Sequence, residues 1–202
     1  MKQKNLDQYD KLSKAFHWIT AIIVVIAFVL GPEDFGRLLD DGIDPGTRND
    51  IIWHESLGIA VFTLTFLRLV WVAVRPDAPR LQMTAWMHLL SRLMHFVLWA
   101  LLFALPLTAL LALGSESIPL TLLGGFRINE LAFIANSNLS GLADWGEVHK
   151  FLGDVIMWSA GIHALAAMYH HIKLKDGVLT SMRLVLLRVK SETLLMIEML
   201  LY

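Results

Sequence analysis

Hydrophobic residues in this chain gather into four long stretches that are separated by polar segments. The stretches span residues 15–31, 51–74, 86–113 and 145–173. A helix needs about 20 mostly apolar residues to cross a bilayer, so the first stretch lies near the lower limit and the others exceed it. The pattern predicts four membrane-spanning helices, the third with a local kink at Pro106.

The distribution of basic residues predicts how these helices are oriented. An acidic loop with Gly and Pro breakers, residues 32–50, follows the first span, and a longer mixed loop, residues 114–144, follows the third. Cytoplasmic loops of membrane proteins carry an excess of Lys and Arg. Here the basic residues precede the first span, separate the second and third, and follow the fourth: Lys2, Lys4, Lys11, Lys14, Arg75, Arg80, Lys173, Lys175, Arg183, Arg188 and Lys190.

We therefore predict an all-α fold, an integral membrane four-helix bundle with both termini in the cytoplasm, over residues 1–176. Residues 177–202 mix Leu, Met and Val with ionisable side chains. Such a segment is expected to form an amphipathic helix on the cytoplasmic membrane surface, because a fifth span would bury five ionisable groups.

Composition supports a membrane protein and restricts its chemistry. Of 202 residues, 56% are hydrophobic and 17% charged, with a mean hydropathy of +0.58, whereas soluble domains average about 45–50% apolar and 25% charged. A net charge of −1 gives no reason to expect a nucleic-acid partner. The absence of cysteine excludes disulfides, cysteine-held iron–sulfur clusters and covalently attached haem. The eight histidines are the remaining supply of metal ligands.

Four of these histidines fall into two pairs matched in depth. His149 and His163 are fourteen residues apart, which returns to nearly the same helix face about 21 Å further along the axis. In the predicted topology His54 lies at the depth of His149, near the periplasm, and His17 lies nearer the depth of His163, towards the cytoplasm. Two cross-bundle bis-histidine sites are what a cytochrome with two b-type haems requires.

Residues near the paired histidines add to this interpretation. His54 and His149 are each followed four residues later by glycine, Gly58 and Gly153, on the same helix face. A glycine there lets a flat macrocycle approach the backbone closely. Arg68 lies fourteen residues after His54, near the cytoplasmic-side pair, where it could contact a haem propionate or extend to the interface.

The other histidines have simpler explanations. His88 and His95 on the third span are expected to be packing or interface residues. His170 and His171 fall at the cytoplasmic interface, where contact with a propionate is an alternative to ligation. His170 shares a face with His163 and lies close in depth to the first-span histidine, so it is the main rival ligand.

Several motifs, taken in order, resemble the bacterial cytochrome b561 family over about residues 8–183. They are KAFHWITA, WHESLG, LRLVW, MHFVLWALLFALPLTALL, VHKFLG and GIHALAAMYHHIKLKDGVL. The resemblance implies a four-helix membrane cytochrome with two b haems. It assigns the ligand roles to four histidines, His17, His54, His149 and His163. It thereby favours His163 over His170.

The resemblance also concerns the third span. The family's usual histidine there matches His95, which implies a role in a quinone site or in the structure around a haem. The family commonly has glycine where this chain has Ala109, and the hydrophobic tail extends beyond the family's usual basic ending.

The function expected from the resemblance is electron transfer across the bacterial inner (cytoplasmic) membrane. Its partners would be lipid, ubiquinone and a redox protein, and for some members the implied activity is superoxide:quinone oxidoreduction. The predicted periplasmic loops are acidic apart from Arg37, Arg48, Arg127 and Lys150, which disfavours steering of an anion. Two alternatives are a membrane-anchor cytochrome b subunit of a dehydrogenase or hydrogenase, and a haem-free metal or proton transporter.

Overall fold

The computed structural model describes residues 8–32, 35–75, 79 and 83–183. Four helices in these ranges are long and apolar enough to cross a membrane. They are α1 (Lys11–Leu30), α3 (Asn49–Val74), α4 (Ala85–Ser115) and α5 (Trp145–Tyr169), the last continuing through a π-helical turn, η3 (His170–Leu174). The prediction of four spanning helices is confirmed.

Capping explains why some helices begin where they do. The side chain of Asp10 accepts a hydrogen bond from the backbone N–H of Ser13 at 2.9 Å, so α1 begins four residues before the apolar stretch. Asp144 caps α5 in the same way, accepting from the N–H of Glu147 at 3.0 Å. Hydropathy marks the part of a helix in lipid, whereas a cap marks where backbone hydrogen bonding starts.

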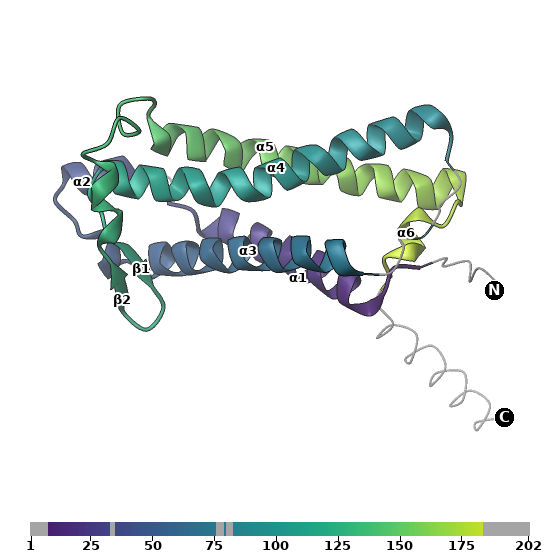
Figure 1. Ribbon diagram of the computed structural model, residues 1–202, viewed down its shortest axis with the longest axis horizontal. Helices are drawn as coiled ribbons and strands as arrows, with labels where there is room; N and C mark the ends of the chain where they lie inside the picture. The colour runs from purple at the N-terminus through teal and green to yellow at the C-terminus, as the bar shows by residue number, and fades with distance from the viewer. Residues whose placement is uncertain (1–7, 33–34, 76–78, 80–82, 184–202) are drawn as a thin grey trace, which may run out of the picture.

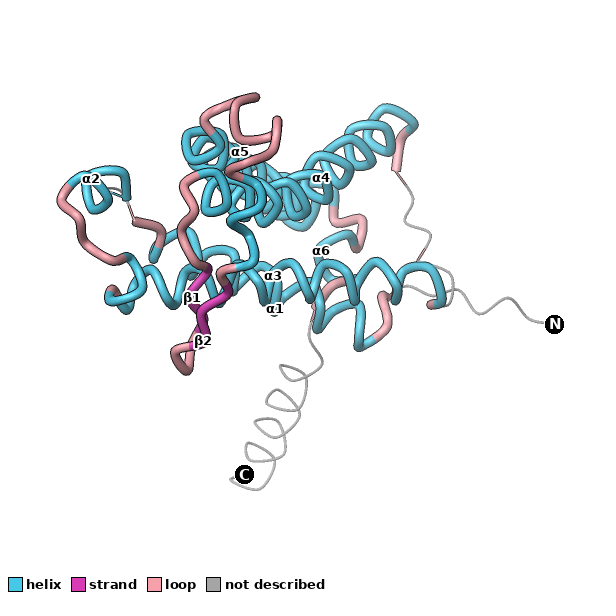
Figure 2. Tube along the Cα trace, turned by 60° about the vertical axis from the view of Figure 1, so that its left-hand side comes forward, coloured by secondary structure: helices cyan, strands magenta, loops and turns pink. Residues whose placement is uncertain are grey.

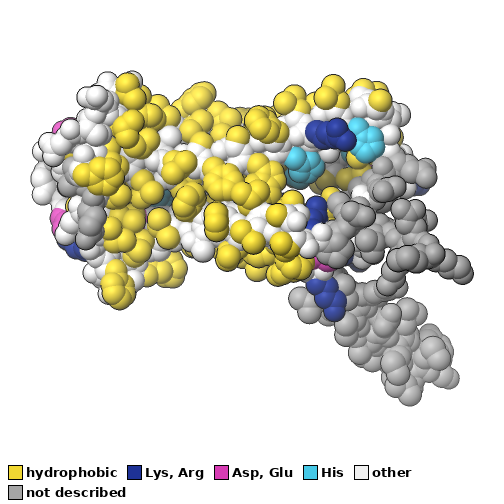
Figure 3. Space-filling view, viewed as in Figure 1, with side chains coloured by type: hydrophobic (Ala, Val, Ile, Leu, Met, Phe, Trp, Pro, Cys, Tyr) yellow, Lys and Arg dark blue, Asp and Glu magenta, His cyan; other side chains and the backbone are white. Residues whose placement is uncertain are grey.

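The four long helices form two layers. α1 packs mainly against α3 and α4 mainly against α5, and α3 also contacts α4 across the layers (Figures 1 and 2). Four buried side chains form the core between the layers, Val61, Leu101, Leu102 and Ile156. Apolar side chains also cover much of the bundle's outer face, as Figure 3 shows for one side. Exposed apolar side chains are expected in a helical bundle that is surrounded by lipid.

A small β-hairpin, which the sequence did not predict, lies at one end of the bundle (Figure 1). Strands β1 (Leu120–Leu122) and β2 (Phe126–Ile128) pair antiparallel. The turn contains Gly124 and Gly125, with φ of 86° and 78°, a backbone region that glycine enters without strain. We call this end of the bundle the hairpin end.

Side chains at the start of α3 hold the hairpin in place. The backbone N–H of Thr121 donates to Glu55 Oε2 at 2.5 Å, and the N–H of Leu123 donates to Ser56 Oγ at 2.9 Å. These bonds satisfy backbone groups that would otherwise lie unpaired beside the membrane.

The rest of the hairpin end consists of short elements. Arg127 on β2 forms a two-bond ion pair with Asp44, at 2.7 and 3.0 Å. Asp44 precedes a 3₁₀ turn, η1 (Pro45–Thr47). The remaining short elements are α2 (Phe35–Asp40) and a second 3₁₀ helix, η2 (Glu130–Ile134).

The opposite end, here called the terminal end, is where the described chain begins and stops. The N–H of Tyr9 donates to the carbonyl of Ser181 at 3.2 Å, and Trp18 Nε1 donates to the carbonyl of Met182 at 3.0 Å. These contacts join the start of α1 to a short helix, α6 (Val178–Ser181). Most of the predicted C-terminal amphipathic helix lies outside the described residues.

Candidate haem-binding sites

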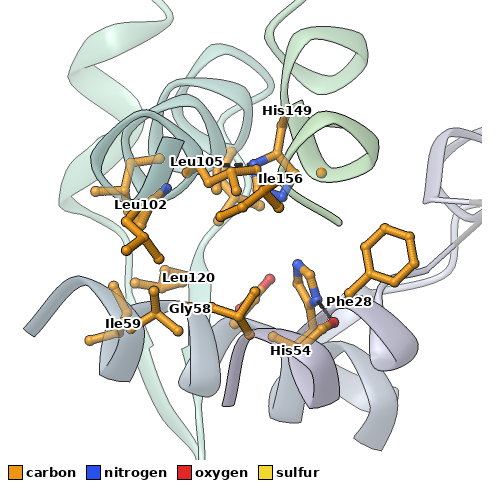
Figure 4. A pocket seen from close by; sticks show the side chains of 18 residues that line it. Phe28, His54, Gly58, Ile59, Leu102, Leu105, Leu120, His149 and Ile156 are labelled. Atoms are coloured by element: carbon orange, nitrogen blue, oxygen red, sulfur yellow. Dashed lines mark hydrogen bonds between the residues drawn. The ribbon is translucent and has the colours of Figure 1, made fainter. Parts of the chain in front are cut away.

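Two of the predicted histidines face each other at the hairpin end. His54 extends from the second turn of α3 and His149 from the second turn of α5, and their rings point towards one another across the bundle (Figure 4). The ring centroids are 6.0 Å apart and the rings are nearly perpendicular, at 89°. The depth matching that the sequence predicted therefore brings these two side chains together.

Hydrogen bonds fix which nitrogen of each ring is available. His54 Nδ1 lies 2.7 Å from the carbonyl oxygen of Ala27, and His149 Nδ1 lies 2.9 Å from that of Leu105. A carbonyl oxygen only accepts, so each Nδ1 carries the hydrogen. Nε2 of each ring keeps its lone pair and is free to bind a metal, the arrangement typical of histidine ligands.

The spacing of the two rings would allow both to bind one metal ion between them. A first-row metal binds imidazole nitrogen at about 2 Å, and the nitrogen lies about 1 Å from its ring centroid, so trans ligands have centroids about 6 Å apart. The observed 6.0 Å matches this value.

Both histidines line an apolar, partly open cavity of about 120 Å³. A protein interior rarely leaves voids much larger than one water, whose share of liquid volume is about 30 Å³. Gly58 and Gly153 both line the cavity, as the sequence predicted for glycines next to a macrocycle. A Cβ added at Gly58 would meet no atom within 4 Å, and one at Gly153 would touch only the ring of Phe28, at 4.0 Å.

The cavity also involves residues that the sequence analysis did not single out. Leu120, from the hairpin, closes one side, and Glu55 lines the wall beside His54 while accepting the hairpin's hydrogen bond. The Gly124–Gly125 dipeptide between two short, mostly apolar runs is a sequence signal that could have revealed this hairpin. The two carbonyl acceptors leave no such signal, because any residue supplies a carbonyl.

The second predicted pair lies towards the terminal end. His17, in the second turn of α1, and His163, two turns before the end of α5, have ring centroids 6.3 Å apart at an interplanar angle of 67°. This spacing again matches two ligands on opposite sides of one metal. A third ring, that of His95 on α4, lies 5.3 Å from His163.

Arg68 lies close enough to His17 and His163 to act on both electrostatically. Its guanidinium stacks over Trp99, 5.0 Å from the ring centroid. Among the described residues it has no carboxylate partner within ion-pair distance. A cation held at this depth without an acidic partner fits an anionic group of a bound cofactor.

The remaining histidines lie away from both pairs. His170 pairs with Asp176. Burial alone would raise the pKa of Asp176, but the hydrogen bonds from His170 and from the N–H of Val178 outweigh it and lower the pKa. His171 and His88 are exposed.

The donor sets fit a haem. In the described part of the chain no group of three or more His, Cys, Asp or Glu side chains converges on a metal position. Pairs of imidazoles suit an ion that brings four in-plane nitrogens of its own, as haem iron does. A glycine-lined apolar cavity around one pair fits the flat macrocycle.

Comparisons with known proteins find similarity along most of the chain. A family model described as prokaryotic cytochrome b561 matches residues 8–183. The chain is 28% identical over 184 residues to cytochrome b561 homolog 2 of Escherichia coli K12, covering 87% of this chain and 91% of that protein. Cytochrome b561 homolog 1 of the same strain is 27% identical, with coverages of 88% and 97%. A Yersinia pestis protein named probable superoxide oxidase CybB is 28% identical over 179 residues, with coverages of 87% and 95%.

Proposed function

We propose, from the premise that the chain belongs to the prokaryotic cytochrome b561 family, that it carries electrons across the bacterial inner membrane through two b-type haems. Membership of the family makes it a multi-pass membrane protein of electron transfer that binds b-type haem. The finer proposal concerns the number of haems, their ligands and their redox partners.

The observation that carries the proposal is the occurrence of two histidine pairs at opposite ends of one bundle. His54 and His149 would hold the haem at the hairpin end, and His17 and His163 the haem at the terminal end. Along α5 the two ligands are fourteen residues apart, about 21 Å. When bound, each haem supplies a centre that accepts and releases one electron at a time.

The chain's own residues prepare these centres. The carbonyls of Ala27 and Leu105 hold the rings of His54 and His149 in one tautomer and orientation, so little reorganisation accompanies metal binding. Leu120 and the other apolar side chains give the cavity a mostly apolar lining. An apolar surrounding reduces the reorganisation that a change of charge requires.

Arg68 is proposed to pair with a propionate of the haem at the terminal end. Its position near His17 and His163 and its stacking on Trp99 support this role. Arginine presents a planar array of donors that matches a carboxylate, and a pair in a low-dielectric setting is screened little by salt.

We propose ubiquinone as the mobile redox partner and superoxide as one candidate donor. Superoxide as a donor is supported by the name of the Yersinia pestis relative, probable superoxide oxidase. Two of the four cations that the sequence places at the hairpin end are paired with carboxylates, Arg127 with Asp44 and Arg48 with Asp50. The field available to attract an anion there is correspondingly weak.

The test of the redox function uses purified protein in lipid nanodiscs. The protein is reduced with a small excess of dithionite and mixed with a short-chain ubiquinone analogue, and the absorbance of the reduced haem is followed. We expect rapid reoxidation that saturates with quinone concentration. Reoxidation no faster than with a redox-inactive analogue of the same size would overturn quinone as the partner. A second mixing experiment, with superoxide and oxidised protein, tests the donor independently.

A further inference from the structure

His95 is an imidazole at membrane depth whose role the two pairs do not explain. Its Nδ1 lies 2.6 Å from the carbonyl oxygen of Ser91, one turn earlier on α4, so Nδ1 carries the hydrogen and donates it. Nε2 is then a bare acceptor, and it has no hydrogen bond among the described residues. The His95 side chain is exposed on the protein. A polar atom left unpaired within the membrane is costly, so a donor is expected opposite it.

The two pairs differ in how their outer nitrogens are satisfied. His54 and His149 each donate Nδ1–H to a backbone carbonyl. Neither His17 nor His163 has such an acceptor in the described part of the chain. A histidine that binds a metal almost always donates its other N–H to a carboxylate, a backbone carbonyl or water. Both ligands proposed for the terminal-end haem therefore lack a protein partner that His54 and His149 have.

The ring spacing around His163 is compatible with His95 as that partner, although the two rings are not hydrogen-bonded in the structure. A hydrogen bond between two imidazoles has a nitrogen–nitrogen distance of about 3 Å, and adding about 1 Å for each ring gives a centroid spacing of about 5 Å. Two imidazoles that share one iron are about 6 Å apart. His95 and His163 are 5.3 Å apart, whereas His17 and His163 are 6.3 Å apart. The larger spacing suits a second iron ligand in His17, and the smaller spacing suits a hydrogen-bond acceptor in His95.

We propose that His95 is a positioning residue, whose Nε2 accepts the Nδ1–H of His163 when Nε2 of His163 binds haem iron. His163 would then donate to His95, and His95 donates to the carbonyl of Ser91. These two hydrogen bonds would fix the tautomer of each ring. This inference rests on the proposed assignment of His17 and His163 as ligands of the terminal-end haem.

The bond would also set the redox potential of that haem. An acceptor on Nδ1–H makes the ligand more basic and favours ferric iron over ferrous. Removing it should shift the equilibrium towards the reduced form. Outer-shell partners of metal ligands are commonly worth 10- to 100-fold, and a tenfold shift of a one-electron couple is 59 mV.

The experiment is a redox titration of the two haems in the full-length protein and three variants. His95→Leu removes the acceptor, while His95→Gln keeps an oxygen acceptor near the position of Nε2. His88→Leu is the matched control, because it removes an exposed histidine two turns earlier on the same helix. We expect one midpoint to rise by about 59 mV in His95→Leu, to return towards wild type in His95→Gln, and to stay unchanged in His88→Leu.

Every other result of the titration either supports or overturns the proposed role of His95. Unchanged midpoints in His95→Leu, or equal shifts in the Leu and Gln variants, would overturn the proposal. Loss of one haem in both variants would make His95 a ligand and overturn it as well. Loss in the Leu variant alone would support it, because the Gln side chain restores the acceptor. A wild-type protein that holds fewer than two haems would instead refute the proposed function on which the inference rests.

Discussion

Gly58 offers a way to separate haem binding from folding. It lies within α3, lines the cavity around His54 and His149, and a Cβ there would meet no atom within 4 Å. Gly58→Leu should therefore not harm the haem-free fold. A helix-interior Gly costs about 0.8–1 kcal/mol relative to good helix formers, so the apoprotein should gain about that much stability.

The same side chain would occupy space that the macrocycle needs. A leucine adds four carbons to a cavity of about 120 Å³. Overpacking of this kind costs about 1–3 kcal/mol, which corresponds to a loss of about 5- to 150-fold in the affinity of the hairpin-end haem. The affinity of the terminal-end haem should not change.

The assay measures haem per chain by pyridine haemochrome after extensive washing, together with thermal unfolding of the haem-free protein. Gly161→Leu is the matched control, because Gly161 is also within a spanning helix with no atom within 4 Å of an added Cβ, but it does not line the cavity. We expect Gly58→Leu to lose one haem and Gly161→Leu to keep both. Wild-type haem affinity at both sites in Gly58→Leu would refute the reasoning.

Three further predictions address packing, pH and charge. Ile156 is 3% exposed in the core, so Ile156→Ala should destabilise the protein by about 2–5 kcal/mol in thermal unfolding; Ile162→Ala, at a site 54% exposed on the same helix, should change little. Hydrogen bonds from Arg127 lower the pKa of Asp44. A lowered carboxyl pKa contributes stability above the ordinary value of 3.8 that is lost as pH falls through the folded-state value. The stability difference between wild type and Asp44→Asn should therefore be present at neutral pH and vanish in acid, and a pH-independent difference would contradict this. Arg68→Gln should lower the midpoint of the terminal-end haem only, by about 59 mV for a tenfold effect, as a redox titration would show; an unchanged midpoint would refute the propionate contact.

The features that sequence could predict are those with long-range regularity. Four apolar stretches gave the spans, and the depths of His54 and His149, and of His17 and His163, gave the pairs that the structure brings together. Helix periodicity is a property of the whole stretch, so the predicted face of a residue does not depend on the identity of any one neighbour. The starts of the helices were less predictable, because Asp10 caps α1 outside the apolar region.

The features that sequence missed depend on backbone atoms or on short local structure. The carbonyls of Ala27 and Leu105 orient the ligand rings, yet a carbonyl has no residue preference. The hairpin has strands of only three residues, too short for a recognisable alternation. The distinction between a third ligand and an outer acceptor at His95 depends on a difference of 1.0 Å, from 5.3 to 6.3 Å, that spacing along the chain cannot resolve.

The most direct test of the central claim is a reduced-minus-oxidised spectrum with haem quantified per chain, for wild type, His54→Ala and His17→Ala. Two low-spin b-type haems in the wild type, with a different one lost in each variant, are the predicted result. A folded protein without haem, or two variants that lose the same haem, would contradict the assignment of one centre to each histidine pair.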